Sequence, residues 1–147
     1  MIKFNWNPEE GLATCIITTG EGNTFIGEAR CHPEDMDVAS EYIGCDLASL
    51  RAEKKQLQYC KNNIIIPGYK ALKQLYYSIN TSKLYNDNSY EAYMIKRQMQ
   101  IKLEELEAVK EEIKKINEAI KNFKANLDAR FTLLRNAKSK REKAILD

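Results

Sequence analysis

The chain has 147 residues, of which 44% are hydrophobic and 30% charged, and its formal net charge is +2. These values are typical of one soluble, helix-rich domain with a modest core. No apolar run approaches the roughly 18 residues that a membrane-spanning helix requires. The first residues lack the apolar core of a signal peptide, so we expect a cytoplasmic protein without a membrane partner.

Cysteine spacing gives little support to a metal site. The four cysteines are scattered along the first 60 residues, and none forms a C-x-x-C pair. Cys31 and His32 are adjacent, which is poor geometry for chelation. We therefore expect reduced, partly buried thiols and no bound metal.

Charge is unevenly divided along the chain. Residues 1–95 carry 9 basic and 12 acidic side chains, whereas residues 96–147 carry 14 basic and 9 acidic ones. The second half fits a solvated coiled-coil surface, and an anion-binding flank is the alternative. The basic residues near the C-terminus could contact nucleic acid, but acidic residues lie between those upstream and no groove-reading motif is present, so we do not expect nucleic acid as a partner.

Residues 1–31 are expected to form an antiparallel three-stranded meander. Segment 12–19 is rich in β-branched residues, which favour strands. Two turn sequences, Asn-Pro-Glu-Glu-Gly at 7–11 and Gly-Glu-Gly-Asn at 20–23, separate the three strands. Such a small sheet has too little area to be stable alone, so it must lie on helices.

A helical arm is expected over residues 37–80. Pro33 suits a first helical turn, and the acidic residues after it favour the positive end of a helix. Apolar residues then recur at steps of three and four, and we expect Pro67-Gly68 to break or bend the helix. The apolar positions are Ile43, Leu47, Leu50, Leu57 and Ile64, followed by Tyr69, Leu72, Tyr76 and Ile79.

A second, longer helix is expected over residues 89–143, with an apolar row that follows a coiled-coil heptad. Neither Gly nor Pro occurs after Gly68. Lys102 and Arg130 interrupt one row, and the rhythm is lost from Ala137 onward, where we expect fraying. A helix of this length measures roughly 80 Å, so it must pack on a partner helix of the same chain or another. The two rows are Met99, Leu106, Ile113, Ile120, Leu127, Leu134 and Ile95, Val109, Ile116, Phe123, Ala137.

Together these segments predict an α+β fold, in which a small N-terminal meander packs on long antiparallel coiled-coil helices in a single domain of residues 1–147. The polar residues 80–88 would connect the helices, and Asp87, Asn88 or Ser89 would cap the second one.

Motifs typical of enzymes are missing from this sequence. It contains no Walker loop, G-x-G-x-x-G, G-x-S-x-G or H-E-x-x-H motif. The one histidine, His32, stands beside Pro33 at a helix start, where a structural role is the usual one. We therefore expect no catalytic residue and no cofactor.

The segment from Tyr76 to Arg97 is the best candidate for a ligand site. It holds five of the eight tyrosines, together with three asparagines, Lys96 and Arg97. Aromatic rings stack on bases, amides read base edges, and guanidinium groups hold phosphates, but tyrosines at helix junctions also pack simply as structure. The candidate ligand-binding residues are Arg51, Tyr76, Tyr77, Tyr85, Asn86, Asn88, Tyr90, Tyr93 and Arg97, with Arg51 contributed by the facing helix.

Several runs of residues are similar to a known family. The run Cys31 to Asp37 is the most specific of them. Together they resemble the phage-encoded anti-Thoeris signal sponges, the founding family of that kind, and the similarity is strongest over residues 1–77. The runs are Phe4-Asn5-Trp6-Asn7, Gly11-Leu12-Ala13-Thr14, residues 25–37, Leu50-Arg51-Ala52-Glu53 and residues 67–77.

This resemblance implies a non-enzymatic role in an infected bacterial cell. Such proteins bind the cyclic ADP-ribose isomer made by a host TIR-domain sensor and hold it unmodified, so that the downstream effector is not activated. Members assemble through their helices as dimer-based homo-oligomers, such as hexamers, with ligand pockets between subunits. Some also hold cyclic oligonucleotides at separate sites.

An interaction protein is the alternative interpretation. A coiled-coil chain of this kind could bind a host protein or nucleic acid through its helices, without a small-molecule ligand. An enzyme is the third hypothesis and has the least support from the sequence.

Overall fold

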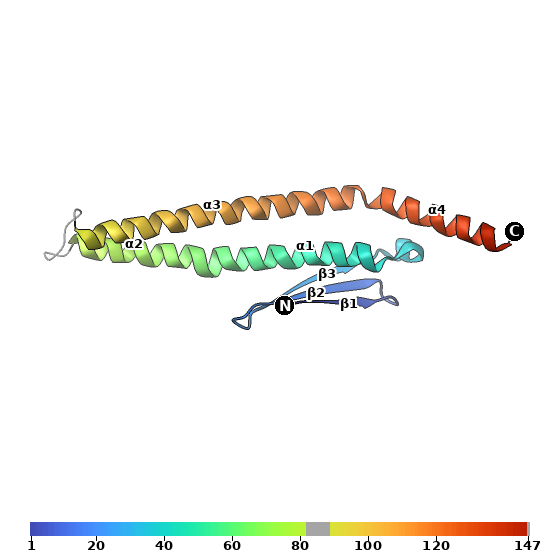
Figure 1. Ribbon diagram of the computed structural model, residues 1–147, viewed down its shortest axis with the longest axis horizontal. Coiled ribbons are helices and arrows are strands. Elements are labelled where there is room, and N and C mark those ends of the chain that lie inside the picture. Colours follow the sequence, from blue (N-terminus) through green and yellow to red (C-terminus); the bar gives the residue numbers. More distant parts are fainter. Residues whose placement is uncertain (82–88, 147) are drawn as a thin grey trace. The chain divides into compact units, whose positions relative to one another are not determined.

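The computed structural model describes residues 1–81 and 89–146 (Figure 1). Three strands come first and helices follow, which confirms the α+β fold class. No helix within the described ranges is both long and apolar enough to cross a bilayer. The elements are β1 (Ile2–Asn7), β2 (Leu12–Thr18), β3 (Thr24–Arg30), a 3₁₀-helix η1 (Pro33–Val38), α1 (Glu41–Tyr59), a π-helix η2 (Cys60–Ile65), α2 (Ile66–Thr81), α3 (Tyr90–Ala125) and α4 (Leu127–Leu146).

The chain divides into two compact units. Unit 1 joins residues 1–55 to residues 115–147, so that the sheet and the first part of α1 belong with the end of α3 and with α4. Unit 2 is residues 56–114 and contains η2, α2 and the first part of α3. The single domain expected for residues 1–147 stays a prediction.

The sheet of unit 1 is the expected meander, with strand order β1-β2-β3 and both pairs antiparallel. Its turns contain Gly11 and Gly22, whose φ angles of 62° and 88° suit glycine. Alternate residues of β2 and β3 are buried, as a sheet with one covered face requires. These inward residues are Ala13, Cys15, Ile17, Phe25, Gly27 and Ala29.

Small residues bring α1 directly onto this covered face. A Cβ atom added to Gly27 would collide with the backbone at Ala48 and Ala52, and both of these alanines are fully buried. Nearer the N-terminus of α1, Gly44 lies against Ala13 and Trp6 of the sheet. The helix backbone therefore rests on the sheet without intervening side chains, which explains why Gly and Ala occupy the contact.

The start of the helical arm differs from the prediction. The segment expected to open a continuous helix forms the separate 3₁₀-helix η1, and α1 begins only at Glu41. Nδ1 of His32 accepts a hydrogen bond from the backbone N–H of Glu34 at 3.2 Å, so this side chain caps η1. The structural role expected for His32 is confirmed.

The irregularity expected at Pro67-Gly68 lies just before these residues. Helical geometry continues through both of them, because α2 begins at Ile66 and is preceded directly by η2. The N–H of Ile66 bonds to the carbonyl of Lys61, five residues earlier. Proline has no N–H and its ring crowds the carbonyl four residues earlier, so we attribute the wider π-helical turns to Pro67.

The long helix expected over residues 89–143 is divided at Asn126 into α3 and α4. Its start is confirmed, because the Ser89 hydroxyl accepts a hydrogen bond from the N–H of Ala92. Phe131, which lies outside both heptad rows, is buried, whereas Leu134 and Ala137 of those rows are exposed. The heptad thus ends near the break, although helical geometry continues to Leu146 where fraying was expected.

Candidate functional site

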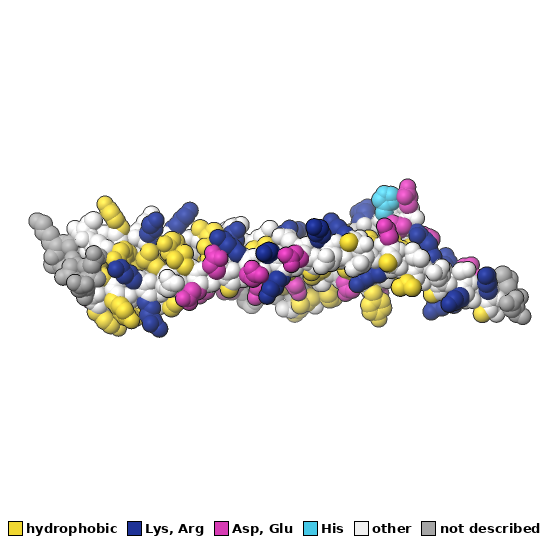
Figure 2. Space-filling view, turned by 90° about the horizontal axis from the view of Figure 1, so that it is seen from above, with side chains coloured by type: hydrophobic (Ala, Val, Ile, Leu, Met, Phe, Trp, Pro, Cys, Tyr) yellow, Lys and Arg dark blue, Asp and Glu magenta, His cyan; other side chains and the backbone are white. Residues whose placement is uncertain are grey.

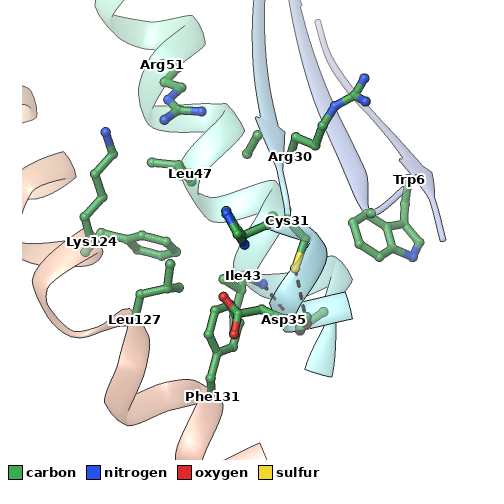
Figure 3. A pocket seen from close by; sticks show the side chains of 16 residues that line it. Trp6, Arg30, Cys31, Asp35, Ile43, Leu47, Arg51, Lys124, Leu127 and Phe131 are labelled. Atoms are coloured by element: carbon green, nitrogen blue, oxygen red, sulfur yellow. Dashed lines mark hydrogen bonds between the residues drawn. The ribbon is translucent and has the colours of Figure 1, made fainter. Parts of the chain in front are cut away.

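Unit 1 contains a cavity of about 260 Å³ between the sheet, α1 and the junction of α3 with α4 (Figure 3). Figure 3 shows Leu47 and Arg51 on α1 opposite Lys124, Leu127 and Phe131 on the other helices. The elements that form it come from both ends of the chain, so it exists only when the helices of unit 1 fold back beside the sheet.

Apolar and aromatic side chains form most of the cavity wall. Phe123 and Phe131 are 8% and 5% exposed, and Ile43 and Leu47 of α1 lie opposite them. The Arg130 guanidinium covers the Phe123 ring at 4.6 Å from its centroid, which holds that ring in place. The wall can therefore pack against a flat apolar group such as a base.

Three cations border the cavity. One guanidinium N–H of Arg51 donates to the Glu28 carbonyl at 2.6 Å, and a guanidinium has further N–H groups to offer. Lys124 is exposed, and no carboxylate of the described residues lies within ion-pair distance of it. Arg30 lies toward the sheet side and approaches Glu10 at 3.9 Å. Arg51 and Lys124 are thus placed to attract an anionic group from two sides.

One carboxylate at the cavity is already neutralised. Arg135 of α4 donates to Asp35 at 2.9 Å and to Asp37 at 3.1 Å, which joins α4 to η1. The hydrogen bond from Arg135 holds the pKa of Asp37 below its ordinary value. Because one guanidinium serves two carboxylates, this group keeps a single negative charge, fewer than the two positive charges of Arg51 and Lys124.

The cavity also contains a thiol, that of Cys31. Its sulfur donates a hydrogen bond to the Asp35 carbonyl at 3.3 Å. Burial and the nearby Asp35 carboxylate raise the pKa of this thiol, so it stays protonated at neutral pH. A protonated thiol is a poor nucleophile.

The structure places most of the tyrosine-rich segment in unit 2. Tyr77, Tyr90 and Tyr93 are 71%, 71% and 58% exposed. Tyr76 is half-buried, and Nζ of Lys96 lies 5.3 Å from its ring centroid. In Figure 2 hydrophobic side chains gather over the region where α2 ends and α3 begins. These aromatics lie on an exposed surface, where Tyr77 borders an open hollow with Lys70, Lys73 and Ser78.

The expected site residues are therefore divided between the two units. Tyr76 and Tyr77 lie at the end of α2, and Tyr90, Tyr93 and Arg97 lie in the first turns of α3. Arg51 belongs to unit 1, where it borders the cavity with Lys124. The predictions for Tyr85, Asn86 and Asn88 fall outside the described residues.

Sequence reasoning did not select the other residues of the cavity. Phe123 was assigned to a heptad row, and Phe131 was not assigned any role. The sequence did contain an indication of this cluster. Phe123 and Phe131 lie on either side of Arg130, which interrupts the heptad. Their partners on η1 and α1 are about 80 to 100 residues away in the chain, so the pairing could not be read from spacing.

Comparison of the chain with protein-family models, with curated proteins and with solved structures found no match. Within residues 1–81 and 89–146, no group of three or more His, Cys, Asp or Glu side chains is placed to hold a metal ion.

Proposed function

We propose that this protein is a phage anti-defence protein that binds a host immune signal, a cyclic ADP-ribose isomer, and holds it without degrading it, so that the downstream effector is not activated. Cyclic oligonucleotide signals are a second ligand class of the same kind. Such a protein needs no catalytic residue and no cofactor.

The cavity of unit 1 is the observation that carries this proposal. It combines apolar and aromatic walls, formed by Phe123 and Phe131 among others, with cations at Arg51 and Lys124. A cyclic ADP-ribose isomer combines a flat base with negatively charged phosphates, so the two kinds of wall match its two kinds of chemical group. A purely apolar cavity would match only the base.

The volume of the cavity indicates that a single chain encloses only part of such a ligand. About 260 Å³ is available, whereas ligand pockets usually measure roughly 300 to 1,000 Å³. A second chain covering the open side would complete the enclosure. This agrees with the proposal of a homo-oligomer in which two chains close over one ligand.

A sponge acts by stoichiometry, so it needs high affinity for its ligand. A Kd of about 10 nM corresponds to about −11 kcal/mol. Reaching this value with a small dianion requires that its phosphates be paired and its base be buried, since desolvation and lost motion oppose binding. A second chain that closes over the ligand would both pair its phosphates and bury its base.

Calorimetric titration of the full chain with cyclic ADP-ribose isomers and cyclic dinucleotides tests the proposal. We expect at least one of them to bind with a Kd below about 1 μM. Substituting Lys124→Ala should weaken this binding by about tenfold, since a charge-assisted contact is lost. Lys121→Ala is the matched control, because Lys121 is exposed on the same helix and does not border the cavity.

Arg97→Ala separates the two candidate sites. Arg97 is exposed in unit 2, where the tyrosine-rich surface lies. If Arg97→Ala abolishes binding while Lys124→Ala leaves it unchanged, the ligand binds to the tyrosines and the assignment to the cavity is wrong. If no compound in the panel binds, the sequestering function itself is wrong.

The exposed aromatics favour the second candidate function, an interaction protein that binds a host protein or nucleic acid. Tyr77, Tyr90 and Tyr93 are each more than half exposed, and tyrosine is enriched in protein interfaces. This function requires no small ligand. Absence of binding in the calorimetric panel, combined with capture of a host macromolecule that Tyr93→Ala abolishes, would favour it.

A further inference from the structure

The two edge strands of the sheet, β1 and β3, differ in how they are covered. Along β3, the Arg51 and Lys55 side chains of α1 donate hydrogen bonds to the carbonyls of Glu28 and Ile26, each at 2.6 Å. Cationic side chains that cover an edge strand hinder its pairing with other strands. This edge is therefore covered by the chain's own side chains.

Within residues 1–81 and 89–146, no side chain covers the β1 edge in this way. Met1 and Thr18 exchange two backbone hydrogen bonds, and Ile2 to Asn7 continue the same antiparallel register with β2. Because bonded and non-bonded pairs alternate along such a ladder, the N–H and C=O groups of Ile2, Phe4 and Trp6 point away from β2. Among the described residues, no hydrogen bond reaches these outward groups.

The side chains at these three positions are apolar and lie on the covered face. They stand opposite Ile17, Cys15 and Ala13, which are all buried, and directly opposed residues point to the same side of a sheet. Yet Ile2 is 59% exposed and Phe4 47%. The helix α1 reaches Trp6 through Gly44 and leaves the other two side chains uncovered.

We propose that β1 pairs with β1 of a second copy of this chain, antiparallel, so that the two sheets become one continuous sheet. Phe4 lies opposite the second copy's Phe4 on the two-fold axis, and Ile2 lies opposite its Trp6. The outward backbone groups of each strand then bond to those of the other, and the exposed apolar side chains bury one another on a single face.

Charge selects this register among the few that the backbone allows. Only Ile2, Phe4 and Trp6 offer outward groups, so the pair must be centred at residue 3, 4 or 5 for more than one residue of each strand to bond. A centre at Lys3 would place two lysines directly opposite each other, which is destabilising. A centre at Asn5 leaves Ile2 without a partner. A centre at Phe4 places Lys3 opposite Asn5 and pairs the whole strand.

A charge exchange at Phe4 tests the pairing, because this residue lies opposite itself. In the proposed dimer, Phe4→Lys and Phe4→Glu each place like charges face to face. Each variant alone should associate more than tenfold more weakly than the unchanged chain in sedimentation velocity. An equimolar mixture of the two variants should recover the association, since every mixed pair then joins opposite charges.

Ile26→Lys is the matched control. Ile26 is 41% exposed, close to the value for Phe4, and lies on β3 with its side chain on the opposite face of the sheet. This variant should associate like the unchanged chain. If the two Phe4 variants and their mixture all sediment like the Ile26→Lys control, the proposal is wrong. If helices also join copies of the chain, the Phe4 variants should halve the mass of the assembly.

Hydrogen exchange of the unchanged chain tests the same pairing without a substitution. The amides of Ile2, Phe4 and Trp6 should become protected as protein concentration rises, whereas those of Lys3 and Asn5 should be protected throughout. Rapid exchange of the first three at every concentration would overturn the pairing with a second copy and leave the edge open to a different partner.

Failure of this pairing is distinguishable from failure of the proposed function. Phe4 does not border the cavity, so a protein that does not pair through β1 can still be titrated with ligand. A protein that binds no ligand can equally show the amide protection expected of the pair.

Discussion

The two units of this chain are built in different ways. Unit 1 brings backbone against backbone: Gly27 meets the α1 backbone between Ala48 and Ala52, and residues of both chain ends surround one cavity. Unit 2 depends on an apolar row between helices, and its buried hydrophobic residues are Ile65, Ala92 and Ile95 among the residues described.

This difference determines where a specific site can be placed. Close contacts between small residues permit one relative position of sheet and helix, and side chains that border such a contact are held in fixed positions. A heptad row constrains its neighbours less, and large residues outside the row, such as Tyr77 and Tyr90, are exposed. Under the proposed function, unit 1 is therefore the candidate region for the ligand, and the surface of unit 2 is the candidate region for contacts with macromolecules.

The largest expected effect is at the closest contact. Gly27→Val would drive a branched side chain into the α1 backbone, which cannot move without separating from the sheet. We expect the free energy of unfolding to fall by about 4 kcal/mol or more. Urea denaturation followed by circular dichroism measures this change.

Gly20→Val is the control for this substitution. A Cβ at Gly20 would meet nothing within 4 Å, so the free energy of unfolding should change by less than about 1 kcal/mol. Equal effects of the two substitutions would show that Gly27 does not carry the contact between sheet and helix.

The next largest effect is expected at Phe131, which is 5% exposed and forms part of the cavity wall. Phe131→Ala should lower the free energy of unfolding by about 3 kcal/mol, because buried apolar surface is lost and a larger void is left. Leu133→Ala, at a side chain that is 70% exposed, should have an effect within about 0.5 kcal/mol. Thermal unfolding compares the two variants. An unchanged unfolding temperature for Phe131→Ala would mean that α4 does not pack on the rest of unit 1.

A smaller effect, with a clear pH dependence, is expected at Arg135. Because Arg135 lowers the pKa of Asp37, this interaction stabilises the folded chain fully above the ordinary aspartate pKa of about 3.9. The stabilisation is lost as pH falls through the lowered pKa of the folded state. Arg135→Gln should therefore reduce the unfolding temperature at neutral pH and leave less of a difference from the unchanged chain at the lowest pH.

Arg141→Gln is the control for this pH profile, since Arg141 is also an exposed arginine of α4. Its unfolding temperature should follow the unchanged chain at every pH. A constant difference between Arg135→Gln and the unchanged chain from neutral to acid pH would contradict the assignment of the shift to Asp37.

The smallest effect is expected in unit 2, at the contact of Lys96 with Tyr76. A cation–π contact whose cation is exposed to solvent, as Lys96 is, contributes about 0.5 to 1 kcal/mol. Lys96→Met keeps most of the side-chain length, and the loss of the contact with the ring should lower the free energy of unfolding by about this amount. Lys110→Met is the control, because Lys110 has no ring partner in the described structure. Urea denaturation of the two variants measures the difference.

Local sequence signals predicted the elements well and the contacts between them poorly. The turns containing Gly11 and Gly22 and the Ser89 cap follow from residue types at fixed offsets, so they could be predicted. The break at Asn126 could not, because α3 and α4 both consist of good helix formers and the end of the heptad depends on Phe131 packing against distant residues. Arg51 was selected for its charge, whereas the aromatic walls beside it could not be identified without the fold.

The most direct test of the account is recovery of the bound molecule in its original form. Purified protein is incubated with the cyclic ADP-ribose isomer that binds in calorimetry, separated from free ligand, denatured by heat, and the released compound is identified by liquid chromatography and mass spectrometry. We predict one unaltered ligand peak in proportion to the protein. A hydrolysed product, or a supernatant without ligand, would contradict the central claim that this chain holds a signal without changing it.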